Sequence, residues 1–160
     1  MRAVKRALAA AALAGLVVVP GAASHIVIHE CIGGVSLYDR SARVERTLGA
    51  PVRKTTNGAV RVWHYPGLTV GVDIPRDVVV YVATTKQSER TAGGTGVGTT
   101  EAALRATFPK LRCSGKPRTC ELGRAPITFF SMKNGKVARI LIDATSAFDD
   151  APFPKRDPRC

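Results

Sequence analysis

The sequence lacks the short motifs that mark common kinds of catalytic site. It contains no Gly-x-Ser-x-Gly, no His-Glu-x-x-His and no Cys-x-x-Cys. This excludes a nucleophile elbow, a zinc-protease helix and a thioredoxin-like redox pair. The acidic pair Asp149 and Asp150 falls in a proline-rich tail, where a general acid and base would have no pocket. We therefore predict a protein that is not an enzyme, has no catalytic residue and needs no cofactor.

Acidic residues are scarce. The 160 residues include 24 Lys and Arg against 12 Asp and Glu, which gives a formal net charge of +12. The hydrophobic content of 45% is that of a folded chain, so a wholly disordered or collagen-like protein is excluded. The length suits one ordinary domain or two very small ones.

Long hydrophobic runs are missing except for one near the N-terminus. Residues 7–19 are apolar, follow three basic residues and precede a short stretch of small residues. A helix of about 13 residues spans ~20 Å, which is too short for the ~30 Å hydrocarbon core of a bilayer. The pattern is typical of a secretory signal peptide over residues 1–24, cleaved after Ala23 or Ser24. We expect a secreted protein, extracellular or periplasmic, with no transmembrane segment in the mature chain.

The four cysteines predict two disulfides, because an even number in an exported protein indicates disulfide bonding. Cys113 and Cys120 flank a turn-rich hexapeptide that would place them opposite each other in a hairpin. Cys31 and Cys160 would then tie the start of the mature chain to its last residue.

Two helices and two groups of strands are expected. Residues 40–48 and 100–108 each place apolar side chains on one helical face, with Asp39 and Thr99 as N-caps. About four short strands follow each helix, and each group contains an Asn-Gly hairpin signal, at residues 57–58 and 134–135. The expected fold class is α+β, with two tandem helix-plus-antiparallel-meander repeats and the helices on one face of a joined sheet.

The expected organisation divides the chain into six segments. These are a signal peptide (1–24), a mature N-terminal segment (25–33), a first αβ repeat (34–85), a linker (86–95), a second αβ repeat (96–143) and a proline-rich C-terminal tail (144–160).

Several of these motifs resemble a known fold over roughly residues 32–143. The motifs of the first copy are Gly34-Val35-Ser36, Val44-x-x-x-Leu48-Gly49-x-Pro51 and Trp63-x-Tyr65. The second copy runs from Gly96 to the Gly135-Lys136-Val137 strand. They resemble the β-lactamase-inhibitor-protein-like group, which includes the outer-membrane assembly lipoproteins (SmpA/OmlA-like). The resemblance implies a non-enzymatic protein that binds other proteins through an open sheet face and hairpin loops.

The first hairpin departs from that group. Residues 53–58 of this sequence include two basic residues and no acidic one. The β-lactamase inhibitor of that group instead presents an acidic hairpin tip to its enzyme. β-Lactamase inhibition is therefore not implied, and a small secreted bacterial protein is the closer likeness.

Histidine and glycine patterns give weak signals for ligands. His25 and His29 are weak candidates for a copper site, but few ligands converge and a disulfide would use Cys31. His64 points to the strand face opposite that of Trp63 and Tyr65, and the sequence offers it no catalytic partner motif. The glycines of residues 93–98 are not followed by Lys-Ser/Thr, which favours a linker over a phosphate loop. We predict no metal.

Aromatic and basic residues are the candidate binding groups. Residues 127–130 are apolar on both strand faces, so one sheet face could be uncovered. Residues 105–139 carry nine basic residues and one acidic residue, a net charge of +8. The candidates are Trp63, Tyr65, Phe130, Arg112, Lys116, Arg118 and Arg124.

We expect a binding protein that uses an open sheet face and a basic hairpin loop to contact an acidic protein or an anionic envelope component. One alternative is a binder of anionic cell-envelope polymer or lipid headgroups, and another is a small secreted copper-binding protein or enzyme. Nucleic acid is not an expected partner, because no aromatic residues interleave the basic ones to stack on bases.

Overall fold

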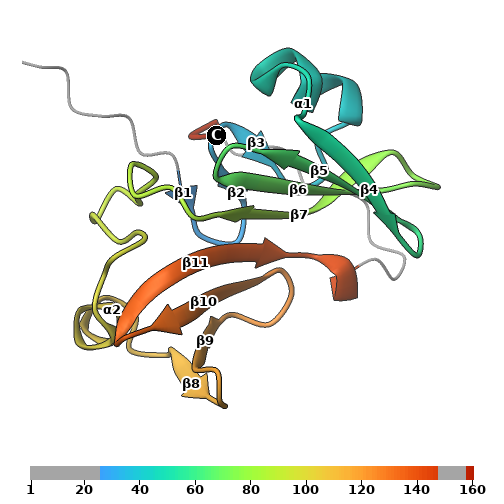
Figure 1. The fold of residues 1–160 in the computed structure, drawn as a ribbon. Helices are drawn as coiled ribbons and strands as arrows, with labels where there is room; N and C mark the ends of the chain where they lie inside the picture. Colours follow the sequence, from blue (N-terminus) through green and yellow to red (C-terminus); the bar gives the residue numbers. More distant parts are fainter. Residues whose placement is uncertain (1–25, 148–157) are drawn as a thin grey trace, which may run out of the picture.

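The computed structural model describes residues 26–147 and 158–160 (Figure 1). The predicted signal peptide, His25 and most of the predicted C-terminal tail lie outside the described residues. Within them the chain forms two antiparallel sheets, two short α-helices and one 3₁₀ helix.

The larger sheet has eight strands and the smaller has three. The smaller sheet consists of β1 (Ile26–Val27), β2 (Cys31–Ile32) and β3 (Val35–Ser36). The larger consists of β4 (Arg53–Asn57), β5 (Val60–Tyr65), β6 (Leu68–Asp73), β7 (Val78–Thr84), β8 (Arg112–Ser114), β9 (Thr119–Leu122), β10 (Ile127–Lys133) and β11 (Lys136–Asp143). Its strand order is β4-β5-β6-β7-β11-β10-β9-β8, so the sheet edges are β4 and β8.

Two-residue turns connect β10 to β11 and β4 to β5. Asn134 and Gly135 have φ angles of 52° and 71°, and the predicted Asn-Gly turn forms there. In the other hairpin Asn57 pairs with Val60, which moves the turn one residue from its predicted place, to residues 58–59. Gly58, with φ of 57°, supplies the left-handed conformation that this turn needs.

The first helix, α1, spans Ser41–Leu48. Its N-cap is Arg40 rather than the predicted Asp39, and Arg40 makes no side-chain capping hydrogen bond. The Oδ2 of Asp39 instead accepts a hydrogen bond from the backbone N–H of Ser36 at 3.0 Å. Asp39 therefore stabilises the turn that leads into the helix.

The second helix, α2, spans Glu101–Thr107, and the 3₁₀ helix spans Thr145–Ala147. Thr100, one residue beyond the predicted cap Thr99, caps α2 by accepting a hydrogen bond from the N–H of Ala103 at 3.2 Å. No helix among the described residues has the length and apolar character needed to cross a membrane.

The predicted fold class is wrong. The structure is mostly β, with an eight-stranded and a three-stranded sheet and only two short helices, and it is not two helix-plus-meander repeats. Each helix buries a single side chain, Val44 in α1 and Leu104 in α2, so neither helix makes a covering layer. The prediction also omits the three-stranded sheet, which residues 26–36 form.

The hydrophobic core lies between one face of the large sheet and the small sheet. Strand β7 contacts both β2 and β3, so the small sheet packs against the middle of the large one. The largest fully buried side chains include Trp63, Phe130, Ile140 and Ile142 from the large sheet and Ile26, Ile32 and Val35 from the small sheet. One face of the large sheet therefore packs into the core, whereas the opposite face does not.

Both predicted disulfides are present. Cys31 of β2 is bonded to Cys160, and Cys113 is bonded to Cys120. Cys113 and Cys120 lie directly opposite each other on β8 and β9. The N-terminal sheet is thus covalently joined to the last residue.

Candidate functional site

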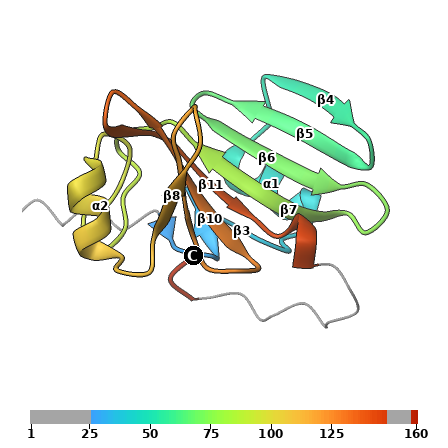
Figure 2. The ribbon, with the colours of Figure 1, turned by 90° about the horizontal axis from the view of Figure 1, so that it is seen from below.

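One face of the eight-stranded sheet is uncovered by any described helix or strand. In Figure 2 this face is turned towards the viewer, and α1 and the small sheet lie behind it. Side chains alternate along the strands, so residues of β10 are alternately half-buried on this face and buried on the other. We call the uncovered side the open face.

Side chains in register form rows across the open face. From β4 to β8, one row consists of Arg53, His64, Thr69, Ala83, Leu141, Phe129, Glu121 and Arg112. A second row consists of Val62, Gly71, Tyr81, Asp143 and Ile127. Directly opposite residues lie about 5 Å apart, so each row is a continuous surface.

The middle of these two rows is apolar except for Asp143, which lies between Tyr81 and Ile127 in the second row. We define the apolar strip as Val62, Tyr81, Ile127, Phe129 and Leu141. All five side chains are half-buried. The strip occupies β5, β7, β10 and β11, away from the two edge strands.

Tyr81 owes its position to the glycine opposite it. A Cβ added at Gly71 would lie 2.2 Å from Cε1 of Tyr81, so the ring occupies the space that any other residue at position 71 would fill. Burial raises the pKa of Tyr81, Arg139 opposes this shift and Asp143 adds to it. The phenol therefore stays neutral at physiological pH and adds to the apolar strip.

The four predicted basic contact residues divide into two pairs. The Nη2 of Arg112 lies 2.8 Å from Oε1 of Glu121, and Arg118 is paired with Glu101. Lys116 and Arg124 are exposed, and the described part of the chain offers neither of them an ion pair. Only the second pair therefore presents uncompensated charge.

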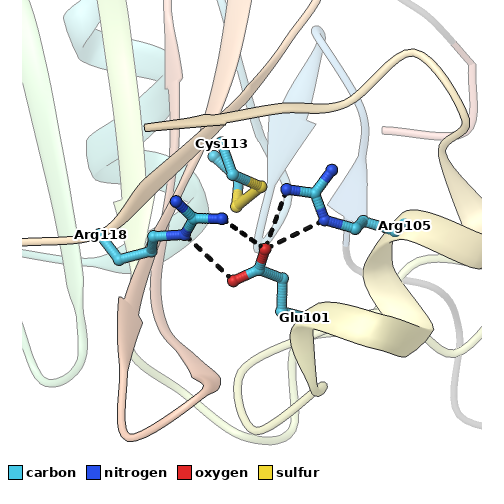
Figure 3. Close-up of a disulfide and its surroundings, with 5 residues drawn as sticks. Glu101, Arg105, Cys113 and Arg118 are labelled. Carbon is cyan, nitrogen blue, oxygen red and sulfur yellow. Dashed lines mark hydrogen bonds and ion pairs between the residues drawn. A yellow bond between two sulfur atoms is a disulfide. The ribbon is translucent and has the colours of Figure 1, made fainter. Parts of the chain in front are cut away.

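Glu101 is held between two arginines beside the Cys113–Cys120 disulfide (Figure 3). Arg105 Nη2 and Arg118 Nη2 each lie 2.9 Å from its Oε1, and Arg118 Nε donates to its Oε2 at 3.2 Å. Hydrogen bonds from Arg118 and then Arg105 lower the pKa of Glu101 to about 2.

The same carboxylate lies within 4.8 Å of both sulfur atoms of the disulfide. Metals bind cysteine as thiolate, and here both sulfurs are in a disulfide and the carboxylate is occupied by arginines. This cluster therefore ties α2 to the β8–β9 hairpin and is not a metal site.

The three predicted aromatic contact residues do not lie on the open face. Trp63 is 2% exposed, and Lys54 Nζ covers its ring at 4.4 Å from the centroid. Phe130 is 0% exposed. Tyr65 packs against the core, and its hydroxyl donates to the carbonyl of Gly49 at 3.2 Å. The structure therefore places these three side chains in or against the core and not on the open face.

His29 fixes the turn between β1 and β2 onto the large sheet. Its N–H donates to Thr128 Oγ1 at 3.1 Å, and its ring Nδ1 lies 3.1 Å from the same oxygen. Burial lowers the pKa of His29, and a hydrogen bond to the backbone of Pro126 partly offsets this. A Cβ added at Gly123 would lie 2.4 Å from Cε1 of His29, so the ring fills the space beside this glycine. These contacts give His29 a structural role, and the copper site stays a prediction whose other candidate, His25, lies outside the described residues.

None of the five strip residues is among the predicted candidate binding residues. A signal was present for Phe129, because Ile127 and Phe129 alternate with the residues of the other face. Tyr81 gave no signal, since it stands within a continuous run of valines and alanine.

Comparisons with known proteins bear on the fold alone. No protein-family model matches the sequence, and no curated protein sequence matches it significantly. Among solved structures, the chain is similar to an extracellular protein containing an SCP domain from Bacillus anthracis str. Ames, with a TM-score of 0.56 and 10% identity. The match covers 69% of this chain and 45% of that one, so this chain spans less than half of the Bacillus protein. The uncharacterized protein yfeY from Escherichia coli gives a TM-score of 0.48 at 15% identity, over 75% of this chain and 97% of that one.

Proposed function

We propose that this protein is a secreted, non-enzymatic binding protein whose open face binds another protein. The apolar strip carries the proposal, because two aromatic and three aliphatic side chains lie together on a face that no described helix or strand covers. Contiguous apolar surface typically marks interaction sites, and aromatic side chains contribute strongly to binding energy.

The strip supports this role because its backbone is held in place on both sides. Strands β7, β11 and β10 each pair with two neighbours, and their opposite faces pack into the core. Side chains on such a scaffold lose little conformational entropy when a partner binds. Tyr81, Leu141 and Phe129 are therefore suited to act as binding anchors.

Secretion is part of the same proposal. The two disulfides are consistent with an oxidising extracellular or periplasmic compartment. The N-terminal pattern of residues 1–24 supports export through a cleaved signal peptide.

A binder of anionic cell-envelope polymer is the second candidate, favoured by Lys116 and Arg124, which are exposed and form no ion pair with the described residues. The two candidates differ in their response to salt. Binding through exposed charges weakens as ionic strength rises, whereas docking on the apolar strip persists.

Site-specific photo-crosslinking tests the first candidate. We expect a covalent adduct with a partner when a photoreactive amino acid replaces Phe129 or Leu141. No adduct should form at Arg46, an exposed residue of α1 on the other side of the sheet. The purified partner should bind the Phe129→Ser variant at least about tenfold more weakly, which corresponds to about 1.4 kcal/mol. Equal crosslinking at Phe129 and Arg46, or unchanged affinity of the variant, would contradict the proposal.

A further inference from the structure

We infer that the partner of the open face is a protein segment in which acidic side chains flank an apolar or aromatic residue. The inference rests on the proposed function and adds the chemistry of the partner. It comes from three cationic residues at the β10–β11 end of the open face, Lys133, Lys136 and Arg139, which we call the basic end.

The strand register places the basic end on the open face. Lys133 pairs with Lys136 across the turn, and the next pair, Met132 and Val137, is buried in the core. Because side chains alternate, the two lysines point to the opposite side, which is the open face. Arg139, beyond the bulge in this hairpin, pairs with Ser131 on the same face.

The basic end is not neutralised by any residue that the structure describes. Like charges directly opposite each other across two strands destabilise the pair. No ion pair to Lys133, Lys136 or Arg139 is formed within residues 26–147 and 158–160. The backbone N–H of Glu101 donates to the carbonyl of Gly135 at 3.1 Å, yet its carboxylate is turned to Arg105 and Arg118.

Of the acidic residues of the open face, Glu121 has its own ion-pair partner, and Asp143 lies at the end of β11 opposite to Lys136. Glu121 is paired with Arg112 at 2.8 Å. Asp143 Oδ1 accepts hydrogen bonds from both the N–H and the hydroxyl of Thr145, each at 2.7 Å. The open face therefore presents a surplus of positive charge at one end, which complements carboxylates of a partner.

The charged and apolar parts of this surface are continuous. Arg139 and Leu141 are consecutive open-face residues of β11, and the charge of Arg139 acts on the Tyr81 hydroxyl. A ligand that covers the strip thus also reaches the basic end. It must bring apolar atoms and negative charges within a few residues of each other.

This combination favours a protein segment over a polymer or a membrane. A phosphate-rich polymer provides charge but no apolar group for the strip. A bilayer needs protruding apolar side chains, whereas the strip residues are half-buried. The exposed large hydrophobic residues of the described chain, Val52 and Ile74, lie outside the strip.

Selection of a random phage-displayed peptide library on the oxidised mature protein tests the inference. We expect enriched peptides to carry Asp or Glu next to an aromatic or aliphatic residue. Their affinity should fall by about tenfold or more in the Lys133→Glu/Lys136→Glu variant, because like charges then face each other. The Arg46→Glu/Lys110→Glu variant, with the same charge change at exposed residues off the open face, should bind as the parent does.

The outcomes separate the inference from the proposed function. Peptides that lose affinity in Phe129→Ser but show no acidic enrichment and bind the lysine variant normally would overturn the inference alone. Failure to select any peptide sensitive to Phe129→Ser would overturn both. Sedimentation with phosphatidylglycerol vesicles and binding of soluble polyphosphate provide the remaining arms. Binding of either probe that depends on Lys133 and Lys136, without selected acidic peptides, would assign the basic end to an envelope component and overturn the inference.

Discussion

At the scale of single residues, a glycine determines the shape of the open face. Gly71 leaves room for the ring of Tyr81, which lies across the neighbouring strand instead of standing away from the sheet. A larger residue at position 71 would displace the ring. The apolar strip therefore depends on the glycine at position 71 as well as on its own five side chains.

Replacing Gly71 by alanine should therefore destabilise the protein. We expect a loss of roughly 1–3 kcal/mol in the free energy of unfolding, because the new methyl group overlaps the Tyr81 ring. Urea unfolding would measure this loss. In a Tyr81→Ala background the same substitution should cost less than about 0.5 kcal/mol. Equal costs in the two backgrounds would show that the contact with Tyr81 is not the cause.

The site could be predicted only in part from residue types. Phe129 and Phe130 are adjacent and identical, and each belongs to an apolar face of β10. Only the fold determines that Phe130 is buried, with Phe108 stacked on it at 6.0 Å between ring centroids, and that Phe129 lies on the open face. The ion pair between Arg118 and Glu101 is similarly invisible in the sequence, because it joins residues that only the fold brings together.

At the scale of secondary-structure elements, two polar contacts hold peripheral parts to the large sheet. His29 attaches the β1–β2 turn to Thr128 of β10. Glu101 attaches α2 to the hairpin of β8 and β9 through Arg118. Each contact responds to acid over a different pH range.

The His29 contact should weaken in mild acid. Burial lowers the pKa of His29 from its ordinary 6.5, so the folded state favours the neutral ring. The resulting stability is present above pH 6.5 and is lost as pH falls through the folded pKa. We expect the urea concentration at the midpoint of unfolding to be lower at about pH 5 than at about pH 7.5. His29→Asn, which tolerates the left-handed φ of 67°, should reduce this fall, and the control His64→Asn should not. The same pH dependence in His29→Asn and the parent would contradict the assignment.

The Glu101 contact should persist into much stronger acid. Its pKa is lowered from 4.5 to about 2, so its contribution is present above pH 4.5 and disappears as pH falls through about 2. A carbon-13 NMR titration of the Glu101 carboxyl should have a midpoint near 2. In Arg118→Ala the midpoint should move towards 4.5. A midpoint near 4.5 in the parent protein would show that the arginines do not hold this carboxylate.

At the scale of the whole molecule, strands of the large sheet were easier to predict than the architecture. Alternation in residues 68–73 and the Asn134-Gly135 turn are local signals, and both match the structure. The small sheet has strands of two residues, which are too short to show any periodicity. Both predicted helices form, but a helical pattern in the sequence does not reveal that each helix buries only one side chain.

The two disulfides should differ in their effect on global stability. Cys31 and Cys160 are 129 residues apart, whereas Cys113 and Cys120 are 7 apart. A longer closed loop restricts the unfolded chain more. We expect Cys31→Ser/Cys160→Ser to lose about 5 kcal/mol and Cys113→Ser/Cys120→Ser about 2.5 kcal/mol. Guanidinium unfolding of the two variants would measure the difference. A larger loss for the short bridge would contradict this order.

The pairing of β7 with β11 also determines when the large sheet can be completed during synthesis. Every other pair of neighbouring strands in this sheet is consecutive in the chain, so it can form as a local hairpin. Val82 and Ile142, which pair across β7 and β11, are about 60 residues apart, and β11 is the last strand that the structure describes. A nascent chain therefore carries an unpaired β7 edge until residues 136–143 are available. Products truncated before β11 keep that edge and become candidates for strand-to-strand aggregation.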